Sequence, residues 1–509
     1  MRGESRQLRL NDLSAGETDF RTAGSQDLTR FGRTERLTLN VLPMKVTPST
    51  RRHFIKTAAT AVSAFTILPR HILGGPRFVP PSETVNVAVV GVGGRGLQNL
   101  RALLALSDVK VVAVADPAET FTLENFYYKG TGGRAAAVAE TEKHYAEKIP
   151  GSRCAGYEDF RVLLEKEKGI DAVLCATPDH LHAWVSIRAM RAGKHVYCEK
   201  PLTHNLWEAR EVARVARETG VATQTGNQGH STMGIRDTVE HLRAGTIGAV
   251  REIHAWVGTK RWNPGLVGKP TDVSAVPPGM NWDLWLGPRE RRDFHPAYHP
   301  VAWRDFWAFG GSAMGDFGCH DLDAATWAFD LPAPTRAEAL NVEPTDAEIA
   351  PHGCTIFFDF PARGGKPPVR ITWHDGGLRP AAPPELGKFP LPRRGVLFIG
   401  EKGVIQCDGA GGAPRVFPEA LRASIVKPEA VLKRVAGHHR DWIDACKGGE
   451  AASSNFEYGA RLTEIALVGV LAQRMQKPIE WDAKNMRATG MPEADPLIRG
   501  TYRPGWEIV

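Results

Sequence analysis

With 509 residues, the chain is longer than a single hydrophobic core usually serves, so two domains with extensions are expected. Hydrophobic residues make up 42% of the chain and charged residues 24%, which are the proportions of an ordinary soluble globular protein. Residues 1–56 hold 11 Lys and Arg against 6 Asp and Glu, so five of the seven net positive charges lie there, and the nearly neutral remainder excludes a nucleic-acid-binding surface.

The N-terminal segment 1–82 resembles an extension that carries an export signal. Thr50-Arg51-Arg52-His53-Phe54-Ile55-Lys56 is followed by the uncharged run Thr57–Leu68, a pattern that resembles a twin-arginine signal, which routes folded proteins across the bacterial inner membrane. The run is too short for an ordinary transmembrane helix, and no clean cleavage site follows it. We therefore expect export by the twin-arginine machinery to the periplasm, or anchoring on the outer side of that membrane. We also expect translation to begin at Met44, which makes residues 1–43 an upstream extension or a disordered segment.

A sharp change of pattern predicts a dinucleotide-binding domain over residues 83–222. The apolar run Val85–Val90 has strand length and leads directly into the loop Gly91–Gly96, which has the spacing G-x-G-x-x-G. A helical stretch, Leu97–Leu106, and a second strand, Val109–Ala115, follow. The glycine spacing alone is weak support. Strand, glycine turn, helix and strand in this order, with an acidic residue 20 residues past the loop, predict a Rossmann fold.

The glycine loop and this acidic residue define the first predicted cofactor contacts. Gly91 permits the tight turn, Gly93 lets the backbone approach the pyrophosphate, and Gly96 lets helix and strand pack closely. The N–H groups at the start of the helix then face the phosphates. Asp116 suits hydrogen bonds to the adenosine ribose hydroxyls and repels a 2′-phosphate, so NAD is favoured over NADP. The cofactor-binding residues predicted in this part are Gly91, Gly93, Gly94, Arg95, Gly96 and Asp116.

Two further parallel strands end in polar motifs. Ile170–Ala176 leads into Thr177-Pro178-Asp179-His180-Leu181-His182, and His195–Cys198 leads into Glu199-Lys200-Pro201. Ligands of an open parallel sheet lie beyond the carboxyl ends of its strands, so both motifs are expected at the cofactor cleft. The cofactor-binding residues predicted here are Thr177, Pro178, His182, Glu199 and Lys200. His180 and His182 form an H-x-H pair without an evident third ligand, and the seven cysteines are scattered, so no metal site is predicted.

From residue 223 the alternation of strands and helices gives way to longer β-like segments. They are Gly248–Gly258, Cys354–Phe360, Val369–His374, Gly395–Ile399 and Val404–Cys407. The fold class is therefore α/β, with an N-terminal Rossmann domain and, over residues 223–482, an α+β domain built on a largely antiparallel open sheet. Residues 483–509 are expected to form an irregular tail. The stretches 263–280 and 376–394 are rich in Pro and Gly and predict long surface loops of the kind that shape specificity.

A motif in the second half completes a family resemblance. Gly310–His320, with the sequence GGSAMGDFGCH, precedes Asp323. Together with the glycine loop, T-P-D-H-L-H and E-K-P, it resembles the Gfo/Idh/MocA family, named after glucose–fructose oxidoreductase, inositol dehydrogenase and a rhizopine-catabolism protein. The resemblance runs from about residue 83 to about residue 482. It implies a dinucleotide-dependent oxidoreductase, and four motifs in this order are specific for the family but hardly for the substrate.

The residue types in these motifs suit the oxidation of an alcohol. The reaction needs a base for the hydroxyl proton, and His320 is the candidate because imidazole titrates near the working pH. Asp316 lies four residues earlier, so on a helix its carboxylate shares a face with His320 and is expected to orient the ring. Lys200 is expected to hydrogen-bond the reacting oxygen. These three are the predicted catalytic residues.

Trp303 and Arg304 are the predicted substrate-binding residues. They resemble a segment found in part of the family, and Arg304 can hydrogen-bond hydroxyls or a carboxylate. Several tryptophans gather in this region, and aromatic faces suit the C–H faces of sugar rings, although core packing accounts for the cluster equally well. They are Trp262, Trp282, Trp285, Trp303 and Trp307.

Three functions remain open on the sequence. The first is hydride transfer between NAD and a sugar, polyol or glycoside. The second is cleavage of a glycoside, or epimerisation, that uses bound NAD transiently, and the third is NAD binding without chemistry, which the joint presence of Lys200, Asp316 and His320 disfavours. Because an exported enzyme meets no large pool of free NAD, we expect the cofactor to be held tightly and recycled in place. A homo-oligomer, dimer or tetramer, is also expected.

Overall fold

The computed structural model describes residues 83–146 and 151–508. The predicted twin-arginine signal lies outside the described residues, so export stays a prediction. Within the described part of the chain, no helix is both long and apolar enough to cross a membrane.

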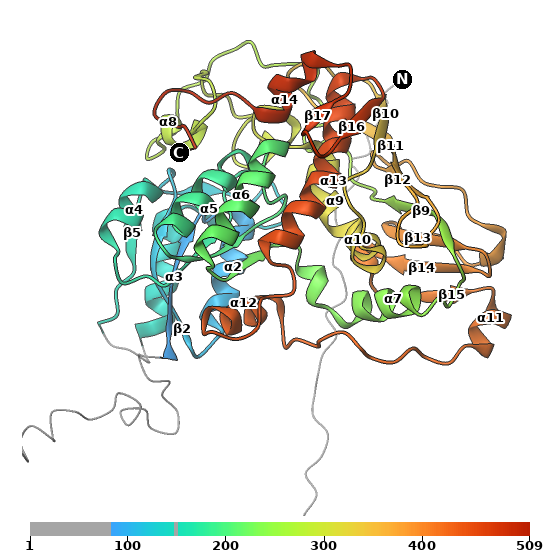
Figure 1. The fold of residues 1–509 in the computed structure, drawn as a ribbon. Coiled ribbons are helices and arrows are strands. Elements are labelled where there is room, and N and C mark those ends of the chain that lie inside the picture. The colour runs from blue at the N-terminus through green and yellow to red at the C-terminus, as the bar shows by residue number, and fades with distance from the viewer. Residues whose placement is uncertain (1–82, 147–150, 509) are drawn as a thin grey trace, which may run out of the picture. The chain divides into compact units, whose positions relative to one another are not determined.

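The first half of the described chain forms a six-stranded parallel sheet in the order β5-β2-β1-β6-β7-β8 (Figure 1). Its strands are β1 (Val85–Val90), β2 (Val109–Ala115), β5 (Ala155–Tyr157), β6 (Ala172–Cys175), β7 (His195–Cys198) and β8 (Thr223–Thr225). The chain runs outward from β1 to β5 and then returns to β6 on the other side of β1. This reversal opens a crevice beyond the carboxyl ends of β1 and β6, where ligands of such sheets bind. The predicted Rossmann topology is confirmed.

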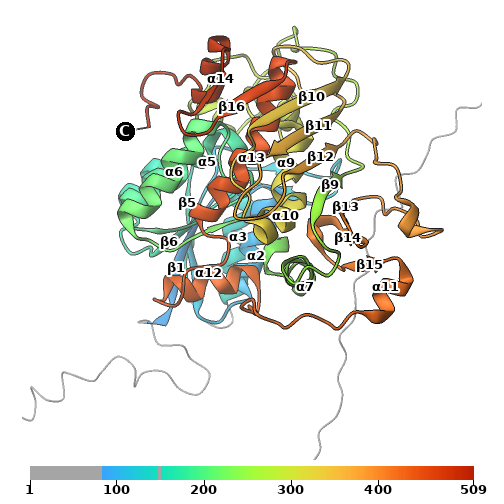
Figure 2. The same cartoon turned by 45° about the vertical axis from the view of Figure 1, so that its right-hand side comes forward.

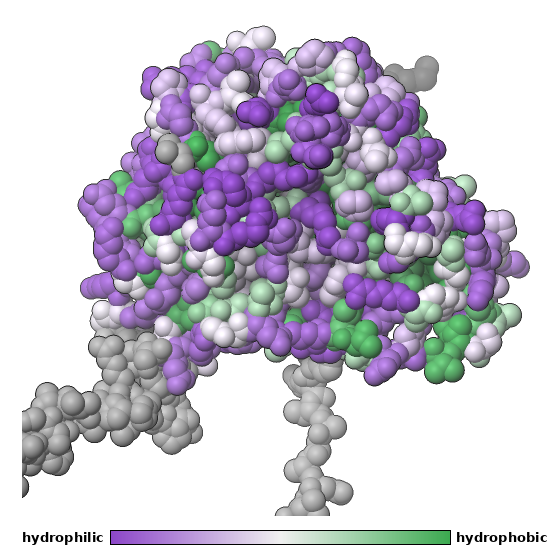
Figure 3. Space-filling view, in the orientation of Figure 1, coloured by the Kyte–Doolittle hydropathy of each residue, from purple (hydrophilic) through white to green (hydrophobic). Residues whose placement is uncertain are grey.

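Helices cover both faces of this sheet, which is why β6 is buried at every position. The helices that follow its strands are α2 (Gly94–Leu104), α3 (Arg134–Ala146), α4 (Phe160–Lys166), α5 (His182–Arg191) and α6 (Leu206–Thr219). Helix α6 begins at a capping box of Asn205 and Glu208 and ends at Gly220, whose backbone is left-handed. Arg214 of α6 pairs with Glu211 and Glu218, and this side of the molecule is mainly hydrophilic (Figure 3).

The second half forms a nine-stranded sheet in the order β15-β14-β13-β9-β12-β11-β10-β16-β17 (Figure 2). Its strands are β9 (Val250–Trp256), β10 (Arg336–Val342), β11 (Gly353–Phe360), β12 (Val369–His374), β13 (Gly395–Gly400), β14 (Val404–Asp408), β15 (Arg415–Phe417), β16 (Ile479–Asp482) and β17 (Arg487–Ala488). Only the β9–β12 pair among them is parallel. The predicted largely antiparallel sheet is therefore confirmed.

A long buried helix, α13 (Phe456–Met475), lies between the two sheets (Figure 2). It contacts α6 on the Rossmann side and β10 and β11 on the other side. Because partners surround it, α13 is apolar around most of its circumference, as a buried helix must be. It also packs against α9 (Ser312–Asp321), the helix that carries Asp316 and His320.

The last part of the chain returns to both sheets. Helix α12 (His438–Cys446) contributes Trp442 and Ile443 to the core beneath β1 and α2. Residues 483–509, expected to be irregular, contain β17 and α14 (Asp495–Arg499), and Trp506 packs edge-on against Trp184 of α5. The isolated apolar residues of this short polar segment show neither helical nor strand periodicity, so the sequence alone did not predict where they pack.

Candidate functional site

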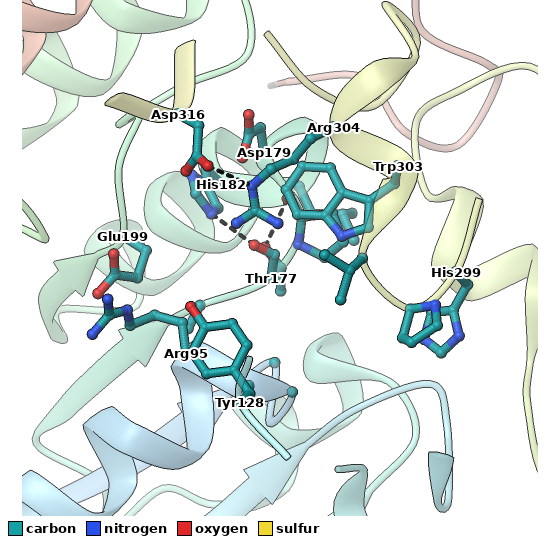
Figure 4. A pocket seen from close by; sticks show the side chains of 18 of the residues that line it. Arg95, Tyr128, Thr177, Asp179, His182, Glu199, His299, Trp303, Arg304 and Asp316 are labelled. Atoms are coloured by element: carbon teal, nitrogen blue, oxygen red, sulfur yellow. Dashed lines mark hydrogen bonds and ion pairs between the residues drawn. The ribbon is translucent and has the colours of Figure 1, made fainter. Parts of the chain in front are cut away.

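A cavity of about 190 Å³ lies at the carboxyl ends of β1, β2, β6 and β7 (Figure 4). Segments of the second half of the chain close its other side. Every catalytic, cofactor-binding and substrate-binding residue named from the sequence lines this cavity, except Gly96. They are Gly91, Gly93, Gly94, Arg95, Asp116, Thr177, Pro178, His182, Glu199, Lys200, Trp303, Arg304, Asp316 and His320.

The glycine loop forms a cradle at one end of the cavity. Gly91 has a φ of +84°, and a Cβ there would lie 2.6 Å from the carbonyl carbon of Ala176. A Cβ on Gly96 would lie 2.0 Å from the oxygen of Gly91, so Gly96 acts outside the cavity, by letting α2 pack against the loop. Among the described residues, no side chain caps the first N–H groups of α2. These groups and the positive end of the helix dipole fit a pyrophosphate.

Two buried carboxylates border this cradle. Asp116 follows β2, its Oδ2 accepts a hydrogen bond from Val92 N (2.9 Å), and burial raises its pKa to about 6. Glu199 follows β7, and its Oε1 accepts hydrogen bonds from Asn99 (2.9 Å) and Gln228 (2.6 Å). The Oε2 of Glu199 is buried and has no hydrogen-bond partner within the described chain. An orphaned buried acceptor of this kind fits a ligand that donates hydrogen bonds.

His182 borders the cavity, but its ring already has partners. Its Nδ1 lies 2.7 Å from the carbonyl oxygen of Pro201, and its Nε2 lies 2.9 Å from that of Thr177. The ring therefore joins the T-P-D-H-L-H and E-K-P segments. Ligand atoms of Cys175, His182 and Cys198 lie within 4.8 Å of one another, a group that the sequence analysis did not recognise. Since both nitrogens of His182 face carbonyl oxygens, we assign the ring a structural role.

Lys200, Arg304 and Asp316 form a buried ionic cluster at the other end of the cavity, and Figure 4 shows Arg304 beside Asp316. The Nζ of Lys200 donates hydrogen bonds to Oδ1 (2.5 Å) and to the backbone oxygen (2.8 Å) of Asp316. The Nε of Arg304 lies 3.3 Å from Oδ2 of the same carboxylate. Burial alone favours the neutral acid, but the two cations hold the pKa of Asp316 well below its ordinary value.

The predicted pairing of Asp316 with His320 is not what the structure shows. Both residues lie on α9 as expected, but the Asp316 carboxylate is directed to Lys200 and Arg304. His320 is half-buried and lines the cavity. Burial and the charges of Lys200 and Arg394 lower the pKa of His320 well below its ordinary value, so the imidazole is neutral and can accept a proton.

Two segments roof the cavity; the sequence indicated a site role for part of the second, at Trp303 and Arg304, but none for the first. One is the hairpin of β3 (Phe121–Thr122) and β4 (Thr131–Gly132), between β2 and α3, and the other is the loop 262–304. Their backbones are joined, because Glu119 N donates to the oxygen of Gly279 (2.8 Å). The ring of Phe121 also meets that of His299 edge-on, with centroids 4.7 Å apart.

Two tyrosines of this hairpin reach the site. Tyr127 stacks on Trp262, with ring centroids 5.9 Å apart. Tyr128 lies over the glycine loop, since a Cβ on Gly94 would meet its ring at 2.2 Å (Figure 4). The pair stands in a stretch without helical or strand periodicity, so only the three-dimensional structure reveals its position.

Two charged residues of the cavity were also missed. Asp179 belongs to the T-P-D-H-L-H motif, and burial raises its pKa to about 7. Arg394 comes from the loop 376–394, which the sequence analysis regarded as specificity-determining. Its Nε and Nη2 donate to Asp321, at 2.8–3.0 Å, which holds the guanidinium at the cavity wall.

The tryptophan cluster divides between packing and the site. Trp282, Trp285 and Trp303 belong to one buried aromatic core, and Trp307 belongs to the core of the second sheet. Trp285 and Trp303 also line the cavity. The guanidinium carbon of Arg304 lies 4.1 Å from the ring centroid of Trp303, so these two predicted substrate-binding residues hold each other in place.

Known proteins share both halves of this architecture. Residues 85–227 match the family model described as oxidoreductase family, NAD-binding Rossmann fold, and residues 245–343 match that of the oxidoreductase family, C-terminal alpha/beta domain. The WlbA dehydrogenase from Bordetella pertussis, solved in complex with NADH and UDP-GlcNAcA, has the same fold. Its TM-score is 0.54 at 14% identity, covering 78% of this chain and 99% of that chain.

Two curated relatives match part of the chain. The scyllo-inositol 2-dehydrogenase (NAD(+)) of Bacillus subtilis is 30% identical over 165 residues, which are 32% of this chain and 42% of that protein. A glycosyl hydrolase family 109 protein of Stenotrophomonas maltophilia is 34% identical over 170 residues, which are 33% of this chain and 34% of that protein. The chain therefore spans less than half the length of each relative.

A parallel sheet with a glycine cradle at its switch point, beside a cavity, is the architecture of a dinucleotide-binding Rossmann domain. The two family matches support membership of the Gfo/Idh/MocA oxidoreductases and confirm the prediction of an NAD-binding domain.

Asp316→Ala tests the ionic cluster. Removal of this carboxylate leaves Lys200 and Arg304 buried without their common partner, so the free energy of unfolding at pH 7 is expected to fall by about 3–5 kcal/mol in urea titrations. The stabilisation is present above the ordinary aspartate pKa of about 4 and is lost as the pH falls below it, because the folded-state pKa is depressed.

Asp330→Ala is the matched control, since Asp330 pairs with Arg461 at the surface. Asp330→Ala is expected to lower the free energy of unfolding by no more than about 1 kcal/mol. Equal losses in the two variants would show that the cluster does not depend on Asp316.

Proposed function

We propose that the protein is an NAD-dependent oxidoreductase that acts on a hydroxyl-bearing carbon of a sugar, polyol or glycoside. The observation that carries the proposal is that the cluster of Lys200, Arg304 and Asp316 lines the same cavity as His320 and the glycine cradle. The relative named as a scyllo-inositol dehydrogenase supports a polyol or sugar as substrate.

Each residue of the cluster has a role that follows from its surroundings. NAD, when bound, supplies the acceptor for the hydride. Asp316 holds the ammonium group of Lys200 in the cavity, where it stabilises negative charge on the substrate oxygen. His320 is neutral and takes the hydroxyl proton. Arg304 and Trp303 present hydrogen-bond donors and an aromatic face to the substrate.

Cleavage or epimerisation of a glycoside is the second candidate. The relative named as a glycosyl hydrolase family 109 protein favours it. Such a reaction would use bound NAD only transiently, so no net NADH would accumulate. The same Lys200, Asp316 and His320 serve both reactions, and the products decide between them.

We further propose export by the twin-arginine route and tight retention of the cofactor. Support comes from the pattern at residues 50–68 and from the two roofing segments, which leave a cavity of about 190 Å³. Pockets for drug-sized ligands usually measure at least ~300 Å³, so the roof must open, or form around the dinucleotide, for NAD to bind. A homo-oligomer is also proposed, since Leu340 and Val342 expose apolar side chains on β10.

Lys200→Ala and His320→Ala test the reaction. The protein is incubated with a panel of sugars, polyols and glycosides, while NADH absorbance and products are followed. Each variant is expected to lose about 10²–10⁴ in turnover, the usual cost of a missing acid–base group, with unchanged NAD affinity. Net NADH with a free sugar supports the dehydrogenase, and cleavage without net NADH supports the second candidate. Near-normal turnover removes that residue from the mechanism.

Asp116→Ser tests the choice of NAD over NADP. Asp116 repels a 2′-phosphate, whereas Arg134 lies beside it, with Nη1 3.3 Å from the backbone oxygen of Asp116. The variant is expected to shift the ratio of the dissociation constants toward NADP, measured by fluorescence titration. Arg134→Ala added to Asp116→Ser should abolish the gain. Wild-type protein that binds NADP as tightly as NAD contradicts this role of Asp116.

Cofactor retention and export are tested together. Protein recovered from the periplasmic fraction is expected to carry about one dinucleotide per chain after dialysis, because the roof prevents exchange. Tyr128→Ala, which removes a ring from that roof, should speed the loss of NAD. Arg51-Arg52→Lys-Lys should keep the chain in the cytoplasm. Free exchange of NAD by the wild type, or its cytoplasmic location, would refute the corresponding half of the proposal.

A further inference from the structure

A second cavity, of about 240 Å³, lies apart from the first. It is formed where the start of α6, the loop after α8 (Trp282–Leu286), the end of α13 and the α14 region meet. None of its lining residues lines the first cavity. Its charged lining residues are Arg289, Glu290, Arg292, Glu348 and Arg474. Three arginines thus share a small space with two glutamates.

Arg474 is the least compensated of these cations. It stands near the end of α13, with its guanidinium carbon 5.6 Å from the ring centroid of Trp307. No ion pair of the described residues includes Arg474. Burial, and then the charge of Arg289, lower its pKa to about 10. Glu348 also acts on this guanidinium, but its carboxylate is paired with Arg292, so the charge of Arg474 is only partly balanced and a further anion would stabilise it.

Arg289 is also incompletely balanced. It is only 8% exposed, and its Nη2 donates to Nδ1 of His204 (2.8 Å). Its closest carboxylate, Glu208, lies 3.8 Å away, and the oxygens of Glu208 accept from Tyr502 OH (2.8 Å) and from His204 N (3.0 Å). The Nε of Arg289 is buried and has no hydrogen-bond partner among the residues described.

Arg292 provides the internal comparison. Its Nη1 donates to Oε2 of Glu348 at 3.1 Å, so this arginine has a hydrogen-bonded counter-charge, although its Nε, like that of Arg289, has no partner among the described residues. Glu290 is exposed at the rim. Glu348 therefore pairs with Arg292. Among the described residues, Arg289 and Arg474 have no carboxylate within hydrogen-bond distance, so their guanidinium groups can donate to a further acceptor.

We infer that this second cavity is a binding site for a small oxyanion, a carboxylate or phosphate group, held by Arg289 and Arg474. Guanidinium groups match the planar or tetrahedral oxygens of both anions with paired N–H donors. The cavity is smaller than the ~300 Å³ at which pockets for drug-sized ligands begin, which restricts the ligand to a small anion or to one anionic group of a larger molecule.

The test uses NAD-saturated protein, so that phosphate cannot act at the glycine cradle. Thermal unfolding is followed while inorganic phosphate or acetate replaces chloride at constant ionic strength. Binding to the folded state raises the unfolding temperature as the anion concentration passes its dissociation constant. A rise with phosphate alone identifies a phosphate site, a rise with acetate alone identifies a carboxylate site, and no rise with either overturns the inference.

Arg474→Met removes the charge and keeps the stem of the side chain over Trp307. This variant is expected to lose the anion-dependent rise and, without the anion, to unfold no earlier than the wild type, because its uncompensated charge is gone. The matched control is Arg499→Met, since Arg499 is exposed on α14 and does not line the cavity, so it should respond as the wild type does. An undiminished rise in Arg474→Met would overturn the inference.

Arg474→Lys is the alternative test of the site if Arg474→Met does not fold. It keeps the charge but loses the paired donors, so it is expected to weaken anion binding about tenfold, the effect of one charge-assisted hydrogen bond. Calorimetric titration with phosphate or acetate measures that change directly. An unchanged dissociation constant in Arg474→Lys contradicts the assignment of Arg474.

Discussion

The geometry of the site depends on one carboxylate with two cationic partners. Asp316 comes from α9 in the second half of the chain, Lys200 from the end of β7, and Arg304 from the loop before α9. Burial alone favours the neutral acid of Asp316, and the two adjacent cations keep its carboxylate charged. The same contact links the end of β7 to α9, so one ionic cluster connects cavity residues from both halves of the chain.

The features that could be predicted from the sequence are those encoded locally. The strand, the glycine loop and the helix that follows are adjacent in the chain, and their order fixes a Rossmann fold with Asp116 at its edge. The strands of the second sheet show runs of apolar or alternating residues, as in β11. The motif residues converge because the ends of parallel strands meet on one side of a sheet.

The features that could not be predicted depend on partners from distant segments. Helical spacing correctly placed Asp316 and His320 on one helix, but it carries no information about Lys200, 116 residues earlier, which takes the carboxylate instead. Tyr128 stands in a segment without periodicity, and only its position over Gly94 connects it with the site. Arg474 stands near the end of a helix whose sequence is mainly apolar, and only the three-dimensional structure shows that it forms no ion pair with the described residues.

Helix α13 has a consequence for how the body of the protein moves and unfolds. Its buried surface is shared by α6, α9 and the second sheet, and α12 just before it carries Trp442 back into the core beneath β1. The chain therefore passes between the two sheets repeatedly, and the two halves cannot separate without exposing the buried surface of α13. The described part of the chain is therefore expected to unfold cooperatively and to lack a hinge between its halves. The hairpin that carries Tyr127 and Tyr128 has few buried contacts, so it is the element expected to open on its own.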